Sequence, residues 1–131
     1  MTTTELDQIH ERATKLAERV DQTKTSIDEF YVSPICPPVG APSLDNLGQA
    51  NARFTNVRHA IEHVLAAHGL ATMLRRVGGE LALAECAVLI EKMNDALDHL
   101  TREFHSAECQ LAVATIAIAK RVSLSGIGVK P

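Results

Sequence analysis

Residues 86–118, CAVLIEKMNDALDHLTREFHSAECQLAVATIAI, decide the fold of this chain. Apolar side chains return along this stretch at alternating intervals of four and three residues, a spacing that places them on one side of a helix. The series consists of Cys86, Ile90, Met93, Leu97, Leu100, Phe104, Ala107, Leu111, Ala114 and Ile118. Such a pattern, sustained over several heptads, predicts a long helix that packs on other helices as in a coiled coil.

Similar spacing predicts two more helices, over about 4–32 and about 44–77, the latter with Ser43 as its N-cap. Gly78 and Gly79 supply a short turn, so that 44–77 and 80–122 form a long antiparallel hairpin. The proline-rich residues 33–43 connect the first two helices, and 123–131 form an extended tail. We therefore expect an all-α three-helix bundle in one domain, 1–131. A break in the third helix near His105 and Ser106 is the alternative.

The composition indicates a folded protein with no general affinity for nucleic acid or membranes. Of the 131 residues, 46% are hydrophobic and 22% are charged, the balance of a folded chain. A formal net charge of −3 gives no general attraction to nucleic acid. No apolar run approaches the roughly 20 residues of a membrane-spanning helix. Cys36, Cys86 and Cys109 are odd in number and widely spaced, which favours reduced thiols and a cytoplasmic location.

No catalytic motif is present in the sequence, and we expect a protein that is not an enzyme and needs no cofactor. The chain has no nucleophile elbow, phosphate-binding loop or dinucleotide fingerprint. His59 and His63, like Asp95 and His99, have the i,i+4 spacing of metal ligands on a helix. Both pairs fall on faces opposite the apolar seams, so we expect solvated side chains there. Metal binding is the alternative.

The stretch His10-Glu11-Arg12-Ala13-Thr14-Lys15-Leu16 resembles the phospho-accepting helix of histidine-kinase dimerisation domains, where His-Glu precedes Thr or Asn by a few residues. The resemblance implies phosphotransfer at His10 on a dimerising helical hairpin. The chain departs from that pattern, because the arginine is displaced and the proline is missing.

His68 differs from the other histidines because it occupies a seam position of the second helix. A lone polar residue in a seam often fixes register or partner choice at some cost in stability. Burial disfavours the charged imidazolium, so we expect His68 to set register and to make stability sensitive to pH.

The segment from Leu111 to Val122 is apolar on every side of the predicted helix, and a helix of that kind is buried on every side. The third helix is also longer than the second, and should overhang it from near Ala114. We therefore expect another chain to cover this end. The predicted contact residues are Leu111, Val113, Ile116, Ile118, Val122, Leu124, Ile127 and Val129.

These features predict a non-enzymatic structural subunit that forms a homo-oligomer through the third helix and the C-terminal tail. The alternative is a small regulatory or inhibitor protein that binds a larger protein through the same apolar surface.

Overall fold

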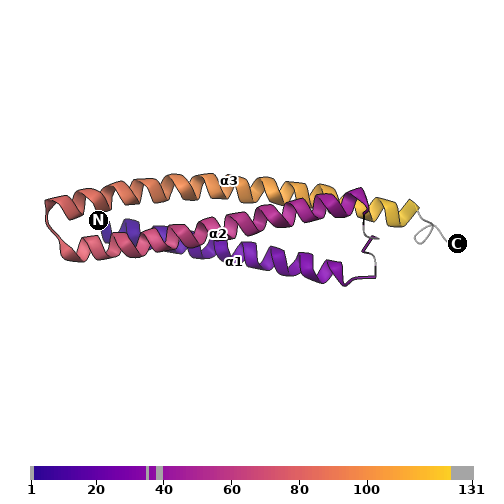
Figure 1. The fold of residues 1–131 in the computed structure, drawn as a ribbon, viewed down its shortest axis with the longest axis horizontal. Coiled ribbons are helices and arrows are strands. Elements are labelled where there is room, and N and C mark those ends of the chain that lie inside the picture. The colour runs from indigo at the N-terminus through magenta and orange to yellow at the C-terminus, as the bar shows by residue number, and fades with distance from the viewer. Residues whose placement is uncertain (1, 35, 38–39, 125–131) are drawn as a thin grey trace.

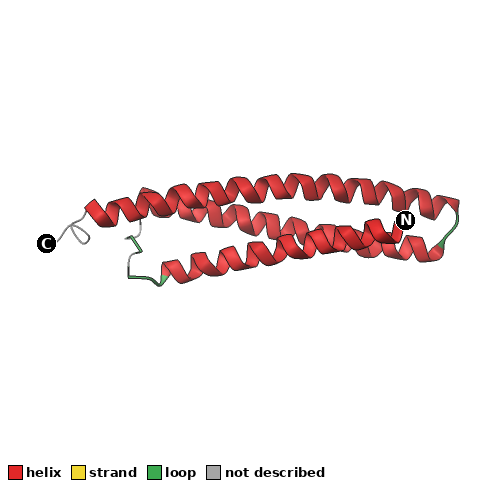
Figure 2. Ribbon diagram, turned by 180° about the vertical axis from the view of Figure 1, so that it is seen from behind, coloured by secondary structure: helices red, strands yellow, loops and turns green. Residues whose placement is uncertain are grey.

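The computed structural model describes residues 2–34, 36, 37 and 40–124, with side chains described between residues 4 and 120 of these ranges. Three helices form an elongated bundle: α1 (Thr2–Tyr31), α2 (Pro42–Val77) and α3 (Glu80–Leu124). Each helix packs on the other two (Figure 1). The described residues contain no strand, as Figure 2 shows, and the predicted all-α bundle is confirmed.

The turn between α2 and α3 depends on two glycines. Gly78 and Gly79 have φ angles of 72° and 80°, a region that side chains with a Cβ rarely adopt. The Gly78 N–H donates to the Leu74 carbonyl at 3.2 Å, which ends α2, and α3 begins at Glu80. The two helices therefore run antiparallel with almost no loop between them, as the Gly-Gly pair predicted.

The core contains the seams that the spacing predicted. Phe54 of α2 and Phe104 of α3 meet edge to face with ring centroids 5.6 Å apart, and the Arg19 guanidinium of α1 lies 4.7 Å over the Phe104 ring. Side chains from all three helices form one continuous core, including Leu6, Ile9, Ala13, Leu16, Val20, Ile27, Leu47, Ala50, Phe54, Val57, Ile61, Val64, Ala71, Cys86, Ile90, Met93, Leu97, Leu100, Phe104, Ala107 and Ala114.

The predicted N-cap of α2 is wrong. Ala41 occupies the cap position without a side-chain hydrogen bond, and Pro42 is the first helical residue. Proline suits that position because its fixed φ is helical and the missing N–H has no partner there anyway. Ser43 therefore lies inside the first turn, where it is buried and its hydroxyl has no partner among the described residues.

The third helix is continuous through His105 and Ser106, so the alternative of a break there is wrong. The part of α3 that is buried within the chain also extends farther than predicted. Ala114 and Ile118 are both buried within the single chain, at 0% and 1% exposure. The overhang therefore begins beyond Ile118 rather than near Ala114, and α3 projects past the start of α2 (Figure 1).

Replacing Phe104 by alanine should lower the free energy of unfolding by about 3–5 kcal/mol, since it removes a fully buried ring and leaves a cavity. Urea titration followed by far-UV circular dichroism measures this change. Phe30→Ala is the matched control. Phe30 is only partly buried near the end of α1, so this substitution should lower the free energy of unfolding by clearly less. Equal losses would contradict the position of Phe104 at the centre of the core.

Tyr31 is 38% exposed, but its partial burial raises its pKa above the usual value of 10.0, with smaller contributions from Cys36 and Asp28. Its hydroxyl lies beside Gly48 of α2. Tyr31 is the chain's one tyrosine and tryptophan is absent, so ultraviolet absorbance reports its ionisation alone. The folded protein should titrate above the urea-unfolded protein, and its stability should fall as pH rises from the unfolded pKa through the folded one. Coincident titration curves would contradict the docking of Tyr31.

Candidate functional site: an apolar groove between α2 and α3

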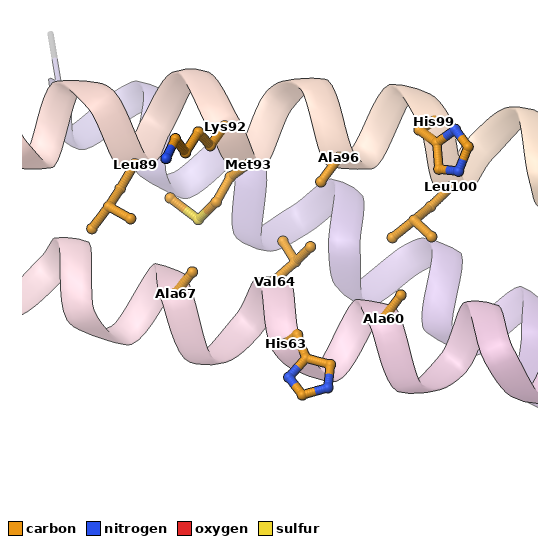
Figure 3. A pocket seen from close by; sticks show the side chains of 10 residues that line it. All are labelled: Ala60, His63, Val64, Ala67, Leu89, Lys92, Met93, Ala96, His99 and Leu100. Atoms are coloured by element: carbon orange, nitrogen blue, oxygen red, sulfur yellow. The ribbon is translucent and has the colours of Figure 1, made fainter.

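The α2–α3 hairpin has a groove on the side that faces away from α1. Figure 3 looks into it, with the α1 ribbon behind the two hairpin helices. The hollow measures about 410 Å³. Its wall, called here the hairpin groove, consists of Ala60, His63, Val64, Ala67, Leu89, Lys92, Met93, Ala96, His99 and Leu100. All ten residues belong to α2 or α3, and no described residue of α1 closes this side.

Small side chains beside the seam create the hollow. Ala60 and Ala67 on α2, and Ala96 on α3, are half-buried next to fully packed seam residues. Alanine at these positions leaves room above the seam that a larger side chain would fill. In helix bundles, small residues of this kind permit another helix to approach closely. The groove therefore has the shape expected where a further helix packs.

The opposite flank of the hairpin is occupied by α1 through polar contacts. Arg12 of α1 pairs with Asp98 of α3 at 2.8 Å, and Arg58 of α2 pairs with Asp21 of α1 at 3.1 Å. Lys24 of α1 also reaches Asn51 and Thr55 of α2. These pairs are partly exposed and each contributes little to stability, but they fix α1 on one flank. The flank that forms the groove keeps its apolar surface.

The groove is closed at one end by a polar network and continues toward the other. Arg53 of α2 donates to Gln110 at 3.1 Å and to Ser106 at 2.9 Å, and it lies 3.4 Å from Glu103. Toward the Gly-Gly turn a second hollow of about 390 Å³ follows, lined by Leu70, Leu74, Ala84, Glu85, Val88 and Leu89. The apolar surface is therefore continuous along the turn-proximal half of the hairpin.

The turn end of the hairpin projects beyond α1, as Figure 1 shows, because α1 begins short of the Gly-Gly turn. Large apolar side chains are exposed there, and Val77 and Leu81 have exposed fractions of 77% and 75%. This exposed set, called here the hairpin tip, comprises Leu70, Met73, Val77, Leu81, Leu83 and Val88. Leu70 and Val88 also line the second hollow, and exposed apolar side chains gathered in this way are typical of a contact with another molecule.

Charge is unevenly distributed along the two hollows. His63, Lys92 and His99 lie on the rim of the hairpin groove, which has no acidic residue in its wall. Glu85 is the single charged residue in the wall of the second hollow. The surface is thus basic at one end and acidic at the other, with apolar residues between.

The two histidine-containing pairs are not gathered into a metal site. His59, His63, Asp95 and His99 are all exposed, but His63 and His99 lie on the groove rim rather than on remote outer faces. Among residues with described side chains, no group of three His, Cys, Asp or Glu could hold a metal ion. The three cysteines are free, with Cys86 buried and Cys109 exposed.

His68 is half-buried rather than fully buried and joins α2 to the start of α1. Its Nε2–H donates to the Leu6 carbonyl oxygen at 2.9 Å, and its ring lies 5.2 Å from that of His10. A contact between one side chain and a single backbone carbonyl gives a physical basis for the predicted role in register. Both the neutral and the charged ring can donate this bond, so the structure gives less support to a role in pH sensing.

The predicted contact residues near the end of α3 differ in how exposed they are. Val113 and Ile116 are exposed at 66% and 59%, as an intermolecular contact requires. Leu111 packs partly on the core, and Ile118 is buried in the chain itself. Val122 and Leu124 are within α3 but their side chains are outside the described residues, as are Ile127 and Val129 altogether.

The groove was not predicted from the sequence, although the sequence contains a signal for it. Alanine or leucine recurs beside the seams at seven-residue intervals, at Ala60, Ala67 and Leu74 on α2 and at Leu89 and Ala96 on α3. Positions that flank a coiled-coil seam are usually charged or polar. An apolar second stripe on both helices indicates a further neighbour on that side. Arg53 and His10, in contrast, show no pattern that predicts their partners.

No family model, curated protein or solved structure matches this chain significantly. Across the part of the chain that the structure describes, no helix is long and apolar enough to span a bilayer.

Removing the His68 hydrogen bond should loosen the start of α1. His68→Leu should increase hydrogen exchange of the α1 backbone amides near Leu6 and His10 and cost about 1 kcal/mol of stability, the usual value of one such bond. His68→Gln keeps a donor and should lose less. His63→Leu serves as the control, since His63 makes no cross-helix bond in the described structure. If exchange near Leu6 is unchanged in His68→Leu, His68 does not set the register of α1.

Proposed function

We propose that this protein is a non-enzymatic helical subunit that associates with copies of itself through the α2–α3 hairpin. The observation that supports this is the distribution of exposed apolar side chains. Ten large hydrophobic residues with described side chains are exposed, and eight of them lie on α2 or α3. They occur in two groups, six at the hairpin tip and two, Val113 and Ile116, near the C-terminal end of α3.

Folding of the single chain does not account for these residues. Leaving a Val, Leu, Ile or Met side chain in water forgoes about 1.5–3 kcal/mol relative to full burial. The core is already continuous without the tip residues, and α3 is already anchored through Ala114 and Ile118. Contacts between subunits would bury these side chains. A chemical role has no comparable support, since the described residues bring no group of three His, Cys, Asp or Glu together as a metal site.

The end of α3 provides one of these contacts in the proposal. Val113 and Ile116 project from a helix that extends past the start of α2 (Figure 1). The C-terminal residues that follow Leu124 belong to the same predicted contact but lie outside the described residues.

Purified protein should form an oligomer at micromolar concentration, with its mass measured by size-exclusion chromatography and light scattering across a dilution series. Ile116→Glu should weaken assembly beyond the smallest oligomer, because it places a charge in an apolar contact, and should leave the far-UV helical signal unchanged. Thr115→Glu is the matched control, since Thr115 is exposed on the same turn. Ile118→Glu should instead reduce the helical signal, because Ile118 is buried in its own chain.

A wild-type monomer at every concentration would contradict self-association and favour the regulatory protein that binds a different partner. An oligomer unaffected by Ile116→Glu would remove the end of α3 from the contact.

A further inference from the structure

We propose that the hairpin groove is occupied by the same groove of a second copy, packed antiparallel about a two-fold axis that passes near Lys92. This inference rests on the proposed self-association and specifies its contact surface. The four hairpin helices of the two copies then form a central four-helix bundle, with each α1 on an outer flank.

The volumes along the groove support this arrangement. Leu70 and Val88 stand out near the turn, each about half exposed, whereas Ala60 and Ala96 leave hollows farther along. Leu70 and Ala60 lie at equal distances on either side of Leu65, and Val88 and Ala96 at equal distances on either side of Lys92. A two-fold axis at the level of Leu65 and Lys92 therefore places the bulky side chains of one copy over the hollows of the other. Knobs of one helix pair enter holes of its partner, as bundle packing requires.

The position of Glu85 also favours the antiparallel arrangement. The axis near Lys92 sets Glu85 of one copy opposite His99 of the other, because both are seven residues from Lys92. His99 on the rim of each hairpin groove thus meets Glu85, the single charged residue in the wall of the second hollow. A parallel arrangement would place His99 beside His99 and Glu85 beside Glu85, and would leave alanine hollows facing each other. The parallel arrangement therefore loses the pairing of Glu85 with His99, whereas both arrangements bring Lys92 to the level of Lys92 of the second copy.

The overlap is large enough for a stable dimer. With the axis at this level, the two α2 helices overlap from Arg53 to Val77, a length of about 37 Å at 1.5 Å per residue. Two adjacent helices of about 10 Å diameter give a contact face of roughly 700 Å² per chain, close to the ~800 Å² per partner of a standard interface. The overlap also includes Leu70 and Val88, the two residues of the exposed tip that line the second hollow.

The first test fills a hollow. Ala96→Leu should raise the dimer dissociation constant at least about tenfold, equivalent to ~1.4 kcal/mol, because the new side chain occupies the space intended for the partner's Val88. Ala87→Leu is the matched control, since Ala87 is exposed on the same helix and is not part of the groove wall. It should leave the dissociation constant within about twofold, well below a tenfold effect. Analytical ultracentrifugation measures both constants, and far-UV circular dichroism confirms that both variants remain helical.

The second test fixes the orientation by cross-linking. A chain with Ala60→Cys and Leu70→Cys, in a background of Cys36→Ser and Cys109→Ser, should give a covalent dimer with a short bis-maleimide. The two sites of one chain are about 15 Å apart along α2, so the reagent should not join them within a chain. Neither single-cysteine chain should cross-link, because each site faces the other site of the partner.

Three outcomes would overturn the inference. Efficient dimers from a single-cysteine chain would show a parallel arrangement. An oligomeric wild type with no cross-linking and no effect of Ala96→Leu would show that self-association uses another surface, so the proposed function would stand without this interface. A monomeric wild type would overturn both proposals and leave the groove to a different protein.

Discussion

Burial of the apolar seam between α2 and α3 is the interaction on which the rest of the structure depends. The Gly78-Gly79 turn brings the two helices together directly, and the seam then packs from Ala71 and Cys86 near the turn to Leu47 and Ala114 at the other end. A helix as long as α3 would not be stable alone in water, because most helix stability in proteins comes from packing. The position of α1, the groove and the exposed ends all follow from this hairpin.

The two flanks of the hairpin are chemically different, and this difference decides where other helices pack. One flank carries polar residues that pair with α1, such as Asp98 with Arg12. The other flank carries alanine and leucine above the seam for half its length, and the Arg53 network closes the remainder. A three-helix chain can cover only one flank of its own hairpin. The uncovered flank therefore has the apolar composition of a protein interior, although it is exposed to solvent in the single chain.

The hairpin extends beyond α1 near the turn, while α3 extends beyond α2 at its C-terminal end (Figure 2). Large aliphatic side chains are exposed near both ends, Val77 and Leu81 at the turn and Val113 and Ile116 on α3 just before its projection. The proposed antiparallel dimer covers Leu70 and Val88 of the tip but leaves the α3 ends outside the overlap. A closed two-fold contact and a second contact at the α3 ends would together allow assemblies larger than a dimer.

The three helices, their antiparallel hairpin and most of the core were predictable from the sequence, because they follow from a heptad spacing and from a Gly-Gly pair between two helices. The sequence also identified Val113 and Ile116 as apolar residues on an unusual helix. Only the tertiary structure decided that Ile118 is buried, that Ser43 is not a cap, and that the uncovered surface is a groove. Spacing predicts which side of a helix is apolar, but whether an apolar side chain is buried depends on where the neighbouring segments begin and end. The same holds for His68, whose seam position predicted burial but whose bond to the Leu6 carbonyl depends on the level at which α1 packs against α2.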